Sequence, residues 1–223
     1  MDDLQDARAE MLNTLDSPRG KLLVTLPTIG YRFLLPVLPA FLQKYPQLEL
    51  DLDFSDQVVD LIDKGKDVAI RGGDLSGSRF MTRRAGPYRF VICASPEYLE
   101  RHGVPREPED LSNHSCLRFR YPRTGKLQDW SLDLPDRPTP RLKTTITSNN
   151  MEAVLAAAVR GLGLAYMPEF LAHDAIDRGL LTSVLDDFTA RRGDFWIVWP
   201  SSQHISPKLR VFIDYMSEAL FQD

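Results

Sequence analysis

The chain has 223 residues, of which 43% are hydrophobic and 26% are charged. This composition excludes collagen-like, low-complexity and disordered classes, and the length allows one large domain or two small ones. The 27 basic and 31 acidic side chains give a net charge of −4. That charge argues against a protein that grips DNA or an anionic membrane over most of its surface.

The first part of the chain alternates strands and helices. Apolar residues at helical spacing predict a helix over residues 1–16. The next predicted elements are a strand at 21–27, a helix at 34–45, a strand at 48–54, a helix at 56–65 and a strand at 67–70. This βαβαβ order predicts a parallel sheet, whose ligand sites lie beyond the carboxyl ends of its strands. Pro36 and Pro39 lie early in helix 34–45, where they are tolerated in or near a first turn and would otherwise kink the helix.

The rest of the chain repeats the α/β theme. Apolar runs predict strands at 88–95, 115–119, 128–134, 141–147, 164–168, 180–185 and 195–200. Helical patterns predict helices at 95–103, 148–163 and 169–179, and a last helix that starts at 206–207. Ser95 can cap the first of these helices, and Ser148 or Asn149 can cap the second. We therefore expect two α/β lobes.

The two cysteines, Cys93 and Cys116, each lie in an apolar stretch. Their number and spacing exclude a disulfide framework and argue against a thiolate metal site, so we expect two buried, reduced thiols. No apolar run reaches the about 18 residues of a membrane span, and the charged N-terminal segment lacks the apolar core of a signal peptide. We therefore expect a cytoplasmic protein with no membrane partner.

A search for an enzyme finds no catalytic pattern. No nucleophile elbow, phosphate-binding loop or dinucleotide fingerprint is present, and the histidines are far apart without metal-ligand spacing. They are His102, His114, His173 and His204. The aspartates of 51–67 alternate with apolar residues, which indicates wet faces of a strand and a helix rather than a cation site. We expect no catalytic residue, no metal ligand and no cofactor.

Positive charge gathers in segment 79–126, which holds ten basic and five acidic residues, a net charge of +5. Most of these side chains are expected on the surface, paired with acidic patches. Arg71 and Arg120 are the two arginines that we keep as candidates for contact with an anionic ligand.

Two loops place small polar residues at helix N-termini, 28–30 and 148–150. Exposed N–H groups and the helix dipole make such places good anion sites, although capping alone would explain the residue types. One such loop in each expected lobe favours a ligand cleft between lobes.

Seven motifs in chain order carry a family resemblance. They are PRGKLLVTLPTIG, LLPVLPAFLQKYPQLELDL, VVDLIDKGKDVAIRGGDL, VICASPEYLERHG, PEDLSNHSCLRF, EAVLAAAVRGLGLAYMP and SPKLRVFIDYM. Over residues 17–222 the chain strongly resembles the effector-binding domain of LysR-type transcriptional regulators. Residues 1–16 resemble the end of the linker helix of that family.

The resemblance implies a fold like the type 2 periplasmic binding proteins: two Rossmann-like α/β lobes joined by two crossing strands, near 91–94 and 195–198. The implied parts are residues 1–19 as the end of the linker helix, 20–93 plus 196–223 as lobe I, and 94–195 as lobe II. An effector is expected in the cleft between the lobes. Together with Arg120, the expected effector-binding residues are Thr28, Ile29, Gly30, Arg71, Gly72, Ser148, Asn149, Asn150 and Met167.

The implied function is the effector-sensing and dimerisation domain of a bacterial DNA-binding regulator. A small molecule, with anions among the candidates, would alter the geometry of a homodimer, or of a tetramer in the full-length protein. Promoter DNA would be reached only through the N-terminal helix-turn-helix of the family, which is not expected among these residues. The alternatives are a solute-binding protein of a transporter on the same fold and, with less support, a two-lobe enzyme.

Overall fold

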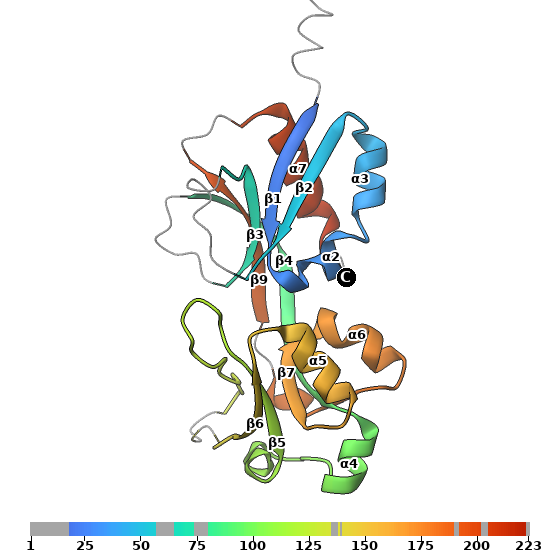
Figure 1. The fold of residues 1–223 in the computed structure, drawn as a ribbon, viewed down its shortest axis with the longest axis vertical. Coiled ribbons are helices and arrows are strands. Elements are labelled where there is room, and N and C mark those ends of the chain that lie inside the picture. Colours follow the sequence, from blue (N-terminus) through green and yellow to red (C-terminus); the bar gives the residue numbers. More distant parts are fainter. Residues whose placement is uncertain are drawn as a thin grey trace, which may run out of the picture. The chain divides into compact units, whose positions relative to one another are not determined.

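The computed structural model describes residues 18–56, 65–73, 80–134, 138, 140–189, 192–201 and 205–221 (Figure 1). The chain forms two compact units. Unit 1 consists of Met1–Ser55, Val59–Gly86 and Phe195–Asp223, and unit 2 consists of Asp56–Val58 and Pro87–Asp194. The predicted helix at 1–16 and nearly all of the predicted helix at 56–65 lie outside the described residues.

The boundaries between the units differ from the expected ones at 93/94 and 195/196. They lie between Gly86 and Pro87 and between Asp194 and Phe195. The first difference arises because β4 (Phe80–Ala94) is a strand of 15 residues, whereas only its apolar half at 88–95 was visible as a strand in the sequence. Strands β4 and β9 (Arg192–Pro200) each contribute residues to both units.

The sheet of unit 1 has the strand order β2-β1-β3-β9. Strand β1 (Gly20–Leu26) pairs in parallel with β2 (Leu48–Phe54) on one side and with β3 (Val68–Gly72) on the other. Strand β3 pairs antiparallel with β9. The predicted parallel arrangement of the first three strands is therefore confirmed.

The predicted single helix at 34–45 is wrong. The chain instead forms a 3-10 turn at Thr28–Gly30, then α2 (Tyr31–Leu34) and α3 (Leu38–Lys44). The break follows from Pro36 and Pro39, which lack the N–H groups that a continuous helix would bond to the preceding turn. Leu38 and Phe41 of α3 are buried in the core, whereas Leu42, expected on the same apolar stripe, is 36% exposed.

The last helix, α7 (Pro207–Ala219), confirms the predicted helix start at 206–207 and packs against β1. Its apolar stripe lies inside unit 1, where Leu209, Phe212, Ile213 and Met216 are buried. Rings of Phe33, Phe195 and Phe221 meet in the same core, with centroids about 5 Å apart. Among the described helices, none is long and apolar enough to cross a membrane.

The sheet of unit 2 has the order β4-β7-β5-β6, with β8 paired to β4. Its strands besides β4 are β5 (Ser115–Phe119), β6 (Lys143–Ser148), β7 (Leu164–Pro168) and β8 (Thr182–Val184). Strand β5 is parallel to both β6 and β7. Strand β4 is antiparallel to β7 and β8.

The helices of unit 2 are α4 (Pro96–His102), α5 (Met151–Val159) and α6 (Glu169–Asp177), with 3-10 helices at Pro108–Asn113 and Asp186–Phe188. Ser95 caps α4 as predicted, because its hydroxyl accepts from the Tyr98 N–H at 3.2 Å. The predicted strand at 128–134 is wrong. Burial alternates there as in a strand, but Arg120 and Leu127 form the isolated bridge of this segment and no ladder follows it.

Candidate functional site

The candidate residues of unit 1 lie at the carboxyl edge of three parallel strands. Arg71, near the end of β3, donates from Nη1 to the Ser55 carbonyl at 2.9 Å and from Nη2 to Thr25 Oγ1 at 3.0 Å. Thr25 belongs to β1 and is fully buried, and Ser55 directly follows β2. One guanidinium therefore links the ends of three strands. Gly72, the last residue of β3, is exposed beside Arg71.

The turn Thr28–Gly30 follows β1 at the same edge. The Gly30 N–H donates to the Pro27 carbonyl at 2.8 Å, and Thr28 and Ile29 are half-buried. Gly30 itself is buried, and a Cβ on it would lie 2.9 Å from the Leu26 Cβ. Close packing on β1 therefore explains this glycine, which leaves Thr28 and Ile29 as the side chains of the turn that can meet a ligand.

The candidate residues of unit 2 lie at the corresponding edge of its own parallel strands. Arg120 directly follows β5, is exposed, and donates its backbone N–H to the Ser148 carbonyl at 2.8 Å. Ser148 ends β6, so β5 and β6 finish side by side. Met167, near the end of β7, is fully buried and paired with Val91, so its side chain has no exposed surface for a ligand.

The loop at 148–150 caps helix α5, but not at the predicted residue. Asn150 is the N-cap, because its Oδ1 accepts from the Ala153 N–H at 3.1 Å. Ser148 Oγ accepts from the Asn150 N–H at 3.0 Å and donates to the Asn150 carbonyl at 3.2 Å. The predicted cap at Ser148 or Asn149 is therefore wrong. Ser148 folds the loop instead, and the exposed Asn149 lies between the two.

The arginines of segment 79–126 follow two patterns. Three of them pair with acids at the surface, as expected: Arg83 with Asp214, Arg89 with Glu169 and Arg101 with Glu97. Arg118 does not, because the segment that follows β5 folds back over it and leaves it only 9% exposed. The sequence carries no signal that separates this buried arginine from its neighbours.

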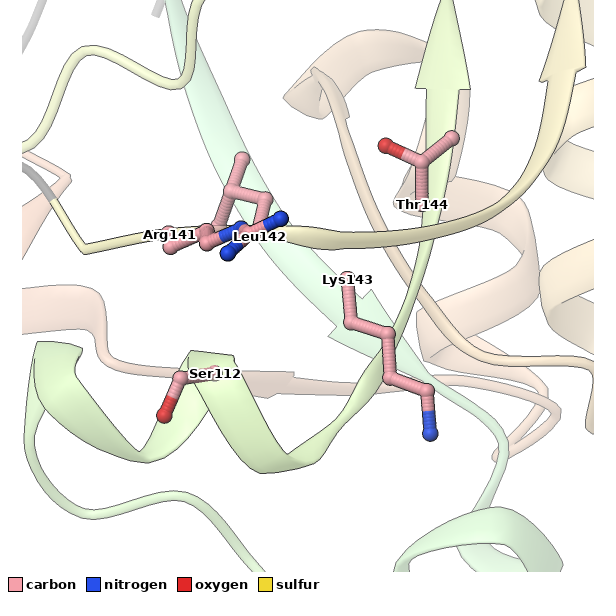
Figure 2. A pocket seen from close by; sticks show the side chains of 5 residues that line it. All are labelled: Ser112, Arg141, Leu142, Lys143 and Thr144. Atoms are coloured by element: carbon pink, nitrogen blue, oxygen red, sulfur yellow. The ribbon is translucent and has the colours of Figure 1, made fainter.

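An open depression of about 520 Å³ lies elsewhere on unit 2 (Figure 2). Its lining residues are Ser112, Arg141, Leu142, Lys143 and Thr144. Lys143 and Thr144 open strand β6, whereas Ser148 closes it. The depression therefore lies at the amino end of β6, away from the candidate residues at the carboxyl end.

The two thiols are buried and reduced, as predicted. Burial raises the pKa of Cys93 to about 12 and that of Cys116 to about 11, so neither forms the thiolate that would act as nucleophile or metal ligand near neutral pH. In the part of the chain that the structure describes, no three histidine, cysteine or acidic side chains are grouped to hold a metal ion.

A polar network lies inside unit 2 around Tyr98. The Tyr98 hydroxyl accepts from the Ser115 N–H at 2.9 Å and lies 3.2 Å from His114 Nδ1. Which of the two groups donates in this contact depends on the tautomer of His114. Burial, and secondarily the nearby His102, lower the pKa of His114.

Comparison with known protein families identifies the fold. The family model described as LysR substrate binding domain matches residues 16–221. The HTH-type transcriptional regulator CrgA of Neisseria meningitidis serogroup C is 32% identical over 224 residues, which cover 99% of this chain and 74% of that protein. An uncharacterized HTH-type transcriptional regulator of Haemophilus influenzae is 30% identical over 209 residues, which cover 93% of this chain and 72% of that protein.

Solved structures agree with the family match. The regulatory domain of CrgA aligns with a TM-score of 0.82 at 30% identity and covers 91% of this chain and 100% of that one. The regulatory domain of AphB from Vibrio vulnificus aligns with a TM-score of 0.70 at 28% identity, over 90% and 98% of the two chains. The predicted mixed α/β fold, like that of the type 2 periplasmic binding proteins, is confirmed. The relatives are regulators and not enzymes.

Proposed function

This chain belongs to the LysR family of transcriptional regulators, as a regulatory domain, and on that premise we propose that it senses a small anionic effector at the carboxyl edges of its two sheets. The observation that carries the proposal is that each unit brings an arginine and a polar turn to one edge of its own parallel strands. In unit 1 these are Arg71 and Thr28–Gly30, and in unit 2 Arg120 and Ser148–Asn150.

Arg120 and Asn149 are the side chains that we assign to direct effector contact in unit 2. Both are exposed, Arg120 carries a planar guanidinium suited to a carboxylate, and Asn149 offers an amide beside the N-terminus of α5. In unit 1, Thr28 and Ile29 are the corresponding contacts, while Arg71 holds the strand ends that position them.

A thermal-shift screen with aromatic and aliphatic carboxylates at millimolar concentration tests this proposal. A ligand that binds the folded chain raises its unfolding midpoint. We expect the screen to contain a carboxylate whose rise is lost in Arg120→Met and in Asn149→Ala and kept in Arg123→Met, which removes a neighbouring exposed arginine. If no carboxylate gives a rise that both Arg120→Met and Asn149→Ala abolish, the proposal is wrong.

We also propose that the chain forms a homodimer through α2, α3 and the edge strand β2. Leu35 directly follows α2 and Leu42 lies on α3, with 47% and 36% of their surface exposed, and burying this apolar surface in a subunit contact is favourable. A tetramer of the full-length regulator and promoter binding through its helix-turn-helix domain complete the proposed assembly.

Light scattering of the purified chain tests the dimer. Leu42→Glu is expected to give a monomer of unchanged fold, because a charge at the centre of an apolar contact is expelled. Leu180→Glu is the control on unit 2, since Leu180 is 45% exposed there. A dimer that survives Leu42→Glu and Leu35→Glu would place the contact on another surface.

A further inference from the structure

Arg118, on β5 of unit 2, is an arginine whose side chain is largely buried. Its side chain is 9% exposed, and Nη2 donates to the Gln128 carbonyl at 2.6 Å. Its Nε is buried without a hydrogen-bond partner in the protein. Among the described carboxylates, none forms an ion pair with this guanidinium. The described residues therefore bury most of a positively charged side chain and supply it with one backbone carbonyl and no acidic partner.

Two further polar side chains belong to Gln128, whose carbonyl accepts from Arg118, and to Trp130, two residues further along. Gln128 and Trp130 come from the segment that folds back over β5, with 5% and 2% of their surface exposed. Because the exposed Asp129 lies between them in extended chain, both side chains face inward toward the sheet. Gln128 Oε1 and Trp130 Nε1 are buried without a partner, as is Arg118 Nε.

Aromatic rings form the surroundings of these groups. The Trp130 ring lies 5.7 Å from the ring of Tyr166, which stacks on Phe90 with centroids 4.7 Å apart. Tyr166 and Arg118 each lie one residue beyond the paired Ala165 and Leu117 of neighbouring strands, so they share a face of the sheet. Arg118 thus lies on the face of the sheet that carries these aromatic rings.

The charge decides what would complete this cluster. A water molecule can satisfy a lone N–H, but it does not neutralise a guanidinium in an apolar interior, where an unpaired charge is strongly unfavourable. An anion both satisfies the N–H groups and neutralises the guanidinium, since its oxygens can accept from Arg118 Nε and from Trp130 Nε1. The amide of Gln128 can present its oxygen or, after a half-turn, its nitrogen to the same group.

We propose that Arg118, Gln128 and Trp130 form an enclosed site in unit 2 for a small carboxylate, separate from the effector-contact residues at the sheet edges. The aromatic walls fit the carbon part of such a ligand, and the guanidinium fits its head. Access is through displacement of residues 120–131, whose outer turn at 120–127 is exposed.

The experiment measures the unfolding midpoint of the chain in sodium formate, acetate or benzoate against sodium chloride at equal ionic strength. We expect a saturable rise of several degrees with a carboxylate, no such rise in Arg118→Met, and an unchanged rise in Arg123→Met. Asn149→Ala, which removes a proposed effector contact, is expected to keep the rise. If the rise in midpoint is lost in Asn149→Ala and kept in Arg118→Met, the carboxylate binds at the sheet edges and the proposed site is wrong.

Gln128→Glu provides a second test that needs no added ligand. The new carboxylate is nearly identical in shape to the amide and belongs to the residue whose carbonyl accepts from Arg118, so in the proposed site it takes the place of the bound anion. We expect a midpoint several degrees above that of the parent in chloride, with no further rise in acetate. Equal responses to chloride and carboxylates in the parent, or a lower midpoint in Gln128→Glu, would overturn the proposal.

Discussion

The arginines at the carboxyl edges of the two sheets are held in different ways. In unit 1, Arg71 is tied to a buried hydroxyl and to a backbone carbonyl, so its side chain is part of the frame of the sheet. In unit 2, the side chain of Arg120 is exposed, and only its backbone is held, by Ser148 and Leu127. Two arginines at the carboxyl edges of the two sheets are therefore held differently: Arg71 fixes the edge, and Arg120 presents an exposed side chain.

Replacing Arg71 should give the largest loss of stability. Arg71→Met removes two hydrogen bonds from a charged donor and leaves the fully buried Thr25 hydroxyl without this partner. We expect the free energy of unfolding to fall by about 3 kcal/mol. Urea unfolding measures the loss, with Arg71→Lys as the control that keeps the charge. A loss below that of the surface variant Arg123→Met would show that Arg71 does not frame the edge.

The turn of unit 1 should be nearly as sensitive. In Gly30→Ala, the added methyl group meets the Leu26 Cβ at 2.9 Å, so the turn must shift away from β1. We expect a cost of about 2 kcal/mol from this overpacking. Gly125→Ala is a useful comparison, because nothing lies within 4 Å of a Cβ there and its cost comes from a left-handed backbone alone. Urea midpoints of the two variants separate the two causes.

The loop of unit 2 should respond less, because it is held by a cap rather than by packing. Asn150→Ala removes the side chain that accepts from the Ala153 N–H at the start of α5. We expect the free energy of unfolding to fall by about 1 kcal/mol. Asn150→Asp, which keeps an acceptor at this position, should restore it. Equal losses in both variants would mean that the cap does not stabilise the helix.

The interior of unit 2 should also make stability depend on pH. The pKa of His114 lies below its ordinary value of 6.5 because the charged ring is disfavoured by burial. The unfolded chain then binds the proton more readily than the folded chain, so stability is complete above about pH 6.5 and falls as the pH drops below it. Unfolding midpoints between pH 7.5 and 5.5 should show this fall and show it reduced in His114→Gln. An unchanged slope in the variant would contradict it.

Arg120→Met should have the smallest effect on stability, within about 0.5 kcal/mol, because its side chain is exposed. Its effect on effector binding, in contrast, should be the largest of the set. Urea unfolding measures the change in stability, and the carboxylate screen on the same preparation measures the change in effector binding. A stability loss comparable with that of Arg71→Met would remove the distinction between the two edges.

Much of the fold could be predicted because its signals are local. Alternating apolar residues and short connections specify β1, β2 and β3, and the parallel ladders follow from their order. The first half of β4 could not be predicted, since residues 80–87 are largely polar or turn-forming and become a strand only in the context of the folded unit. The break between α2 and α3 can be read from the sequence, because Pro36 and Pro39 lack the N–H groups that a continuous helix needs.

The sequence predicts at which strand ends the candidate residues lie, but it does not predict what each side chain does there. Topology places Thr28 and Ser148 at sheet edges, because turns that follow parallel strands lie there. Whether an arginine there frames the sheet, faces solvent or is buried depends on what folds over it. Arg71, Arg120 and Arg118 show these three outcomes, and Arg118 and Arg120 do so although they lie two residues apart in one basic stretch.

The shared strands also fix the order in which the two units can be completed during synthesis. Unit 2 ends at Asp194, so all of its chain is available once that residue has emerged. Unit 1 begins first but needs β9 beside β3 and α7 against β1, both of which come from the last 32 residues or fewer. The unit that opens the chain is therefore the last to acquire its core, and a nascent chain stalled before Phe195 would carry a finished second unit and an open first one.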